Sequence, residues 1–146
     1  AYACLYVNNQ NPKLSDKRVR RAIAHAINVD EIIKTVYNGY GERIAVPLLP
    51  SFSYYDKSLK PVEFDIQKAK DLLAEAGWKD SNNNGTVDKN INGELTELNL
   101  TCTVSAASET GKSTLLLAQG TLKQAGINLE IVPKEFTVIM DDVRKD

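Results

Sequence analysis

The stretch from Leu14 to Tyr40 is the most regular part of the chain, and it constrains the fold more than any other segment. Its first half repeats apolar residues at the i, i+3, i+4, i+7 spacing that gives a helix one apolar face. Asn28 then stands three residues before Glu31, the pattern of a capping box, so a second helix is expected where the first one ends. Two short amphipathic helices need a common core, and the other segments are expected to pack around them. The inward positions of the first helix are Val19, Ala22, Ile23, Ala26 and Ile27.

Two further helices are expected to end in the same way as each other. Asp65 is suited to cap a third helix that ends at Gly77, and a fourth helix over about residues 112–125 would end at Gly126. Each glycine is followed by an apolar residue, as in a Schellman motif. In the first two helices, Ser15 or Asp16 would cap the start of the first and Gly39 would end the second. The apolar contacts would be Trp78 against Leu73 in the third helix and Ile127 against Leu122 in the fourth.

Alternating residues indicate strands in the second half of the chain. Apolar and polar residues alternate from Leu98 to Val104, and a similar pattern begins at Leu129. Because a helix lies between them, the two strands should be parallel and adjacent. The aromatic and apolar segment Tyr2–Asn8 predicts an opening strand. The expected fold is a single α/β domain over residues 1–146, a mixed sheet with packed helices.

The segment from Gly41 to Phe64 is rich in proline and aromatic residues but has no sustained period. A long irregular segment of this kind usually packs as a strap or carries function. The rings of Phe52, Tyr54 and Tyr55 could stack against a ligand, but the expectation is that they seal the strap onto the helices by apolar burial.

Composition excludes several classes of protein. The net charge is -1, which gives no basis for binding nucleic acid or an anionic membrane surface. No apolar run approaches the roughly 20 residues that cross a bilayer. The single histidine, His25, and two cysteines outside any CxxC pair rule out a usual structural zinc site. Cys4 and Cys102 lie in expected strands, where they could form a disulfide or be buried separately.

Three other patterns resemble sites of chemistry. The run Gly111–Thr114 resembles the end of a phosphate-binding loop, but the required earlier glycine is Ala106. The basic run Lys17–Arg21 is interleaved with small apolar residues, so it is expected to be a solvated helix face. His25 has no identifiable nucleophile to serve as a general base. None of the three predicts an enzyme.

The loop that follows the expected third helix matches the start of an EF-hand calcium loop. Oxygen-bearing side chains occupy positions one, three, five and nine around Gly85 at position six. Position twelve is Ile91, where a bidentate Glu would be required, and a solvated Asx turn explains the same residues. A calcium site here is the less favoured alternative, and its ligands would be Asp80, Asn82, Asn84 and Asp88.

Three motifs, in this order, resemble the bacterial extracellular solute-binding proteins of the oligopeptide/dipeptide/nickel class, which serve ABC importers. They are Ser15–Ile23, Ala26–Ile33 and Asp65–Trp78. The similarity continues to Asn128, so it covers almost the whole chain. The resemblance implies a periplasmic binding protein-like (type II) fold. Because proteins of this family are much longer, it also implies that the chain is one lobe, the second, of a two-lobed protein.

The resemblance further implies a function that is not enzymatic. This lobe and the missing first lobe would capture a peptide or other small solute and deliver it to the membrane subunits of an ABC transporter, with no cofactor. The location would be extracytoplasmic, either periplasmic or as a cell-surface lipoprotein, without direct membrane insertion of this segment. The alternative is an extracellular interaction module with a calcium-stabilised Asp/Asn loop.

A candidate binding site follows from the expected strand–helix–strand unit. Ligands of open α/β sheets lie beyond the carboxyl ends of the strands, where a helix N-terminus favours a carboxylate. The loop Ser105–Gly111 would occupy this place. Glu109 could instead meet an amino group, although an exposed loop carboxylate is more simply solvated. The candidate ligand-binding residues are Tyr6, Asn8, Ser105, Ser108, Glu109 and Thr110.

Overall fold

Helices α1 (Lys17–His25) and α2 (Val29–Val36) form the expected pair. The computed structural model describes residues 2–145. Asp16 is the N-cap of α1, and its Oδ1 accepts a hydrogen bond from the backbone N–H of Arg18 at 2.8 Å. Asn28 caps α2 through the N–H of Glu31 at 3.2 Å. The Glu31 carboxylate accepts from the Thr35 hydroxyl, so the reciprocal half of the capping box does not form.

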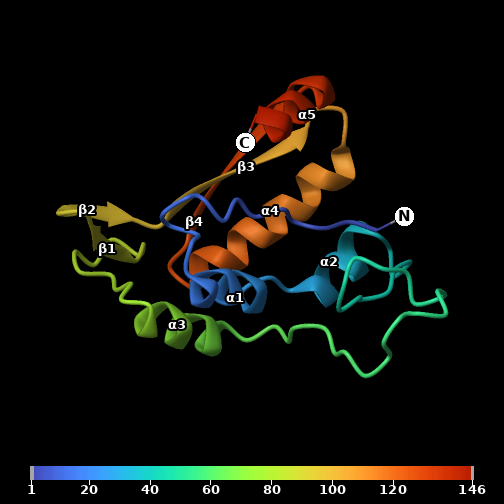
Figure 1. Cartoon of the computed structure of the whole chain (residues 1–146), viewed down its shortest axis with the longest axis horizontal. Helices are drawn as coiled ribbons and strands as arrows, with labels where there is room; N and C mark the ends of the chain where they lie inside the picture. The colour runs from blue at the N-terminus through green and yellow to red at the C-terminus, as the bar shows by residue number, and fades with distance from the viewer. Residues whose placement is uncertain (1, 146) are drawn as a thin grey trace.

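The second half of the chain contains the expected parallel strand pair. Strand β3 (Asn99–Ser105) pairs with β4 (Asn128–Lys134) in parallel register, and α4 (Glu109–Gln124) connects them. In Figure 1, α4 runs between this sheet and the layer formed by α1 and α3 (Ile66–Glu75). The prediction of adjacent parallel strands is confirmed. The chain is therefore α/β, with helices packed on a small sheet.

One apolar core joins the layers. Each of the helices α1, α3 and α4 contributes both alanine and a larger apolar residue, and the strands contribute leucine. The alanines allow the helices to approach closely. The largest fully buried side chains of the core are Val19, Leu73, Leu98, Leu122 and Ile127.

Both expected Schellman motifs are present. Gly77 and Gly126 each have φ of 88°, in the left-handed region. The N–H of Trp78 donates to the Leu73 carbonyl at 2.9 Å, and the N–H of Ile127 donates to the Leu122 carbonyl at 3.0 Å. Each motif returns an apolar side chain to the core directly after its helix ends.

A hairpin precedes the parallel strands. Strand β1 (Asp88–Ile91) pairs antiparallel with β2 (Glu94–Glu97), and the turn between them is Asn92–Gly93. Both turn residues have positive φ, 53° and 89°, as a two-residue hairpin turn of the Asn-Gly type requires. The loop that follows α3 therefore leads into a short hairpin.

The expectation of an opening strand is wrong, and the carboxyl-terminal segment forms a helix for which no prediction was made. Residues 2–8 form no strand, because no described strand pairs with them. Residues Phe136–Lys145 form helix α5, which was not predicted; it packs against β3 and is tied to β4 by the Lys134–Asp142 ion pair at 2.7 Å.

Both cysteines are free thiols. Cys4 is exposed, which contradicts separate burial, whereas half-burial of Cys102 raises the pKa of its thiol.

The strap from Gly41 to Phe64 has no helix or strand, as expected. Of the three rings expected to seal it, only Tyr55 is half-buried, and its hydroxyl accepts from the N–H of Ala45 at 3.4 Å. Phe52 and Tyr54 stack on each other with ring centroids 5.3 Å apart, and both remain exposed. Polar contacts hold the strap instead. Arg43 pairs with Asp30 of α2 at 3.1 Å and donates to the Val62 carbonyl. These contacts connect the two ends of the strap to each other and to α2.

Two substitutions of Asp16 should distinguish its role as the N-cap of α1 from its ion pair with Arg18. The Arg18 side chain and N–H lower the pKa of Asp16 to about 2. Asp16→Asn keeps the cap and removes the ion pair, so we expect a loss of about 1 kcal/mol or less at pH 7. Asp16→Ala should cost about 1 kcal/mol more, since the cap is lost as well. Chemical denaturation measures both variants.

The same pair predicts a pH dependence. Because the folded state lowers the pKa of the Asp16 carboxyl group, the ionised group stabilises the fold fully at a pH above its ordinary pKa of 3.8. That stabilisation is lost as the pH falls through about 2. The difference between the unmodified chain and Asp16→Asn should therefore vanish over this range. A difference that stays constant down to pH 2 would show that the ion pair contributes nothing.

Gly126→Ala should destabilise the fold by about 1–3 kcal/mol, because a side chain at positive φ is strained. A Cβ there would also lie 2.8 Å from Cγ1 of Val87. Gly120→Ala is the matched control, since its Cβ would meet nothing within 4 Å on α4, and it should stabilise the helix. Thermal unfolding of both variants tests the expectation, and equal effects would contradict it.

Candidate functional site

The loop between β3 and α4 lies where the two parallel strands end. β3 finishes at Ser105, and the N–H of Ser108 donates back to its carbonyl at 2.9 Å. The N–H of Ala106 donates to the carbonyl of Lys134, the last residue of β4, at 2.8 Å. The loop is therefore attached to the carboxyl ends of both strands, as the strand–helix–strand unit predicts.

The N-terminus of α4 leaves backbone donors at this edge. Ser108 is the N-cap, and its Oγ accepts from the N–H of Gly111 at 3.0 Å. The turn is tight here, because a Cβ on Gly111 would lie 2.8 Å from that Oγ and 2.9 Å from Cγ2 of Val104. The N–H groups of Glu109 and Thr110 have no preceding helical carbonyl to bond. Together with the helix dipole, these donors favour an anionic group.

Glu109 occupies the rim of this loop. Its side chain is 84% exposed and forms an ion pair with Lys112 at 2.5 Å. Lys112 is thus paired with a side chain of its own helix. Glu109 is therefore exposed to solvent and accessible to a ligand amino group.

Tyr6 and Asn8 lie in the amino-terminal segment that precedes α1. Both are exposed, and Asn8 accepts a hydrogen bond from the N–H of Gln10 at 2.9 Å. The neighbouring Cys4 and Tyr2 side chains raise the pKa of Tyr6 to about 12. Nearby, Lys13 reaches the carbonyl of Asn99 at the amino end of β3, whereas the loop begins at its carboxyl end. The structure groups Ser105, Ser108, Glu109 and Thr110, and among residues 2–145 none of them forms a side-chain hydrogen bond to Tyr6 or Asn8.

The side-chain oxygens of the Asp80 loop already accept hydrogen bonds. Asp80 accepts from the N–H groups of Asn84 and Gly85, at 3.1 and 2.9 Å, and Asn84 accepts from that of Thr86 at 2.9 Å. Asn82 accepts from Asn84, while Asp88 is buried and accepts from the N–H and hydroxyl of Ser81. These are the bonds of an Asx-rich turn. No group of three or more His, Cys, Asp or Glu residues among residues 2–145 is placed to hold a metal ion.

We expect weak or no calcium binding by this loop, because calcium would have to displace those backbone donors without a bidentate carboxylate at position twelve. Calorimetric titration of the chain with calcium chloride measures the affinity. A dissociation constant below about 10 µM, within the range of EF-hand sensors, would contradict this prediction.

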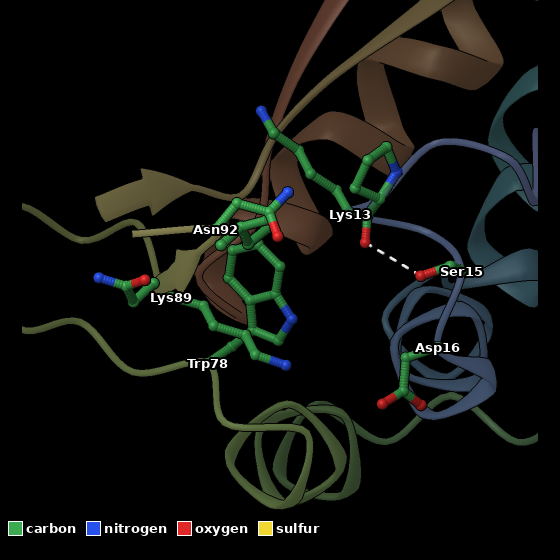
Figure 2. Close-up of a pocket in the computed structure, with 9 residues that line it drawn as sticks. Lys13, Ser15, Asp16, Trp78, Lys89 and Asn92 are labelled. Carbon is green, nitrogen blue, oxygen red and sulfur yellow. Dashed lines mark hydrogen bonds between the residues drawn. The ribbon is translucent and has the colours of Figure 1, made fainter. Parts of the chain in front are cut away.

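A depression in the surface was not found by sequence reasoning. It is an open depression of about 510 Å³ beside Trp78, between the start of α1, the end of α3 and the hairpin (Figure 2). Three separate segments build it, so no local pattern could have indicated it. We call it the Trp78 depression; the residues around it include Pro12, Lys13, Asp16, Trp78, Lys89 and Ile91.

None of the described helices is both long and apolar enough to cross a bilayer.

Comparison with known proteins gives consistent relatives. The chain is 29% identical over 145 residues to the oligopeptide-binding protein AppA of Bacillus subtilis, covering 98% of this chain and 26% of AppA. It is 40% identical over 73 residues to the dipeptide-binding protein of Escherichia coli, covering 50% of this chain and 14% of that protein. The chain thus spans about a quarter of the length of AppA, and less of the other.

Solved structures agree with the sequence relatives. AppA of Bacillus subtilis in complex with a nonapeptide superposes with a TM-score of 0.83 at 30% identity, over 92% of this chain and 26% of that one. NikA of Brucella suis in complex with Fe(III)-EDTA superposes with a TM-score of 0.84 at 28% identity, over 95% and 27%. These neighbours confirm the periplasmic binding protein-like (type II) fold.

The whole described chain falls within one family. The sequence model of the family described as bacterial extracellular solute-binding proteins, family 5 Middle, matches residues 1–146. This match confirms the resemblance drawn from the three motifs. The chain therefore belongs to the family 5 bacterial extracellular solute-binding proteins.

Proposed function

We propose that this chain is a ligand-binding lobe of an ABC-transporter substrate-binding protein that captures peptides for import. The observation that carries the proposal is the loop Ser105–Gly111, attached to the carboxyl ends of both parallel strands and followed by the N-terminus of α4. Backbone donors at that position suit a peptide carboxylate. Support also comes from AppA, which was solved with a nonapeptide, and from the Thermus thermophilus oligopeptide-binding protein, solved with a pentapeptide.

The mechanism we propose needs a second lobe. The chain covers 26% of AppA, so most of the ligand's surroundings would come from other parts of the protein. Ligand held between two lobes stabilises a closed form over an open one, and it shifts the population by as much as it binds the closed form better. The membrane subunits of an ABC transporter would recognise that closed form outside the cytoplasm.

The contribution of this lobe would be recognition without chemistry. Ser108 and the N–H groups of Glu109 and Thr110 would receive a carboxylate, while the Glu109 side chain would set the charge at the rim. Tyr6 and Asn8 would act as a separate contact, because Lys13, five residues beyond Asn8, bonds to the opposite end of β3. His25 would be structural, since its Nδ1 lies 2.8 Å from the Glu63 carbonyl at the end of the strap.

The isolated chain should bind peptides far more weakly than the full-length protein. One lobe supplies only part of the contacts and cannot gain affinity from closure. Calorimetric titration of both forms with the same set of short peptides measures the difference. Equal affinities would place the whole site within this lobe and would contradict the two-lobe mechanism.

Replacing Glu109 and Thr110 together by Ala in the full-length protein should lower peptide affinity by about tenfold or more, as expected when charged and polar contacts are removed from a site. Glu75→Ala is the control, because it removes an exposed carboxylate at the end of α3. If the double variant binds as tightly as the control, the cleft is not at the carboxyl end of β3.

A further inference from the structure

The chain contains three places where an asparagine is followed by glycine, a pair of residues that can deamidate. No Cβ on the glycine hinders the approach of its backbone nitrogen to the carboxamide carbon of the asparagine. All three asparagines are exposed, so exposure does not distinguish them. What differs is how firmly hydrogen bonds hold the two reacting groups. The three pairs are Asn38 with Gly39, Asn84 with Gly85, and Asn92 with Gly93.

The pair at Asn84 is hydrogen-bonded at each reacting group. Asn84 donates from Nδ2 to the Glu97 carboxylate at 2.5 Å, and its Oδ1 accepts from the N–H of Thr86 at 2.9 Å. The N–H of Gly85 donates to the Asp80 carboxylate at 2.9 Å. Hydrogen bonds to ionised carboxylates are stronger than those between neutral groups, so this pair must lose strong bonds before it can react.

The pair at Asn38 belongs to the end of α2. The N–H of Gly39 donates to the Ile33 carbonyl at 2.9 Å, and the N–H of Tyr40 donates to the Tyr37 carbonyl at 2.8 Å. Attack by the Gly39 nitrogen therefore requires the last turn of the helix to open. Ile33 follows the buried Ile32, so this opening also disturbs apolar packing.

The pair at Asn92 has the fewest constraints. Among residues 2–145 no hydrogen bond involves the Asn92 side chain, and the N–H of Gly93 donates only to Oδ1 of Asn90, at 2.9 Å. The turn joins two strands of four residues that form a sheet of their own, and Figure 1 shows this hairpin at one end of the molecule. A two-stranded hairpin is only marginally stable, so its tip opens at low cost in free energy.

We propose that Asn92 is the preferred site of spontaneous deamidation in this chain, because its reacting groups are the least firmly bonded. The backbone nitrogen of Gly93 loses its proton to solvent and attacks Cγ of Asn92. The N–Cγ bond forms, the Cγ–Nδ2 bond breaks, and the departing nitrogen takes a proton from water and leaves as ammonia. Water then opens the cyclic imide at either carbonyl, which gives aspartate or isoaspartate. Water is the only co-reactant, and no group is oxidised or reduced.

Deamidation of Asn92 would change the hairpin and leave the core intact. Asn92 lies at the Trp78 depression (Figure 2), so either product adds a negative charge there. Isoaspartate also adds a carbon to the backbone of the turn, which does not fit the register of a two-residue hairpin turn. The base of the hairpin stays attached, because the N–H of Val87 donates to the Gly126 carbonyl and that of Leu98 to the Val87 carbonyl.

Trypsin separates the three pairs, because cleavage after lysine and arginine places them in the peptides 35–43, 80–89 and 90–112. The folded chain is incubated at mildly alkaline pH, and fragment-ion mass spectra of the peptides give the rate at each asparagine, with the starting sample as reference. We expect Asn92 to react at least about fivefold faster than Asn38 or Asn84, the factor that corresponds to one hydrogen bond of about 1 kcal/mol. In denaturant the three rates should converge, because these bonds are absent.

Two variants test the cause of the preference. Asn90→Ala removes the acceptor of the Gly93 N–H, so it should raise the rate at Asn92 by about fivefold and leave the other two rates unchanged. Asp80→Ala removes the acceptor of the Gly85 N–H and should raise the rate at Asn84 alone. The unaffected pairs in each sample are internal controls that the fold is retained.

The proposal is overturned if Asn38 or Asn84 reacts as fast as Asn92 in the folded chain. It is also overturned if the preference for Asn92 persists unchanged in denaturant, because the fold would then not cause it. The same holds if either variant leaves the rate at its own asparagine unchanged, since hydrogen bonding of the glycine nitrogen would then not set the order of reaction.

Discussion

The left-handed turn at Gly126 is the constraint on which the rest of the structure depends. It ends α4 and places Ile127 in the core with no exposed surface. Its carbonyl accepts from the N–H of Val87 at 2.9 Å, the carbonyl of Val87 accepts from Leu98 at 2.8 Å, and the carbonyl of Leu98 accepts from Asn128 at 3.1 Å. One turn thereby fixes the hairpin, the start of β3 and the start of β4 relative to one another.

The position of the candidate site follows from that register. Because β3 and β4 begin side by side and run parallel, they also end side by side, at Ser105 and Lys134. The helix that follows β3 must then begin at this same edge, and its unpaired N–H groups face the space beyond the strands. The backbone donors at Glu109 and Thr110 are therefore a consequence of topology, and only the side chains there are free to set specificity.

Local signals were sufficient wherever neighbouring residues decide the structure. The caps Asp16, Asn28 and Asp65 and the turns at Gly77 and Gly126 were predicted because each depends on a few adjacent residues. The expected strand at Tyr2–Asn8 failed because a strand needs a partner, and alternation in the sequence does not supply one. Burial of Phe52 and Tyr54 failed for a related reason: proline-rich spacing gave no information on whether a surface was available to cover the rings.

The Trp78 depression illustrates the same limit for sites. Lys13, Trp78 and Lys89 are far apart in the sequence, and they line one depression only after Gly77 has returned Trp78 towards the hairpin and Lys89 has bonded to the end of α3. In contrast, Ser105–Gly111 could be predicted because strand order alone places it.

The loop Ser105–Gly111 and the Trp78 depression lie at opposite ends of β3, whose seven residues span roughly 20 Å. Binding at one end changes affinity at the other only if some element between them has two arrangements that both sites bias. The element between them is a parallel strand pair whose neighbours share one buried core. Such a core resists continuous deformation, so a ligand at the loop Ser105–Gly111 should leave the other end of β3 unchanged unless the lobes themselves move.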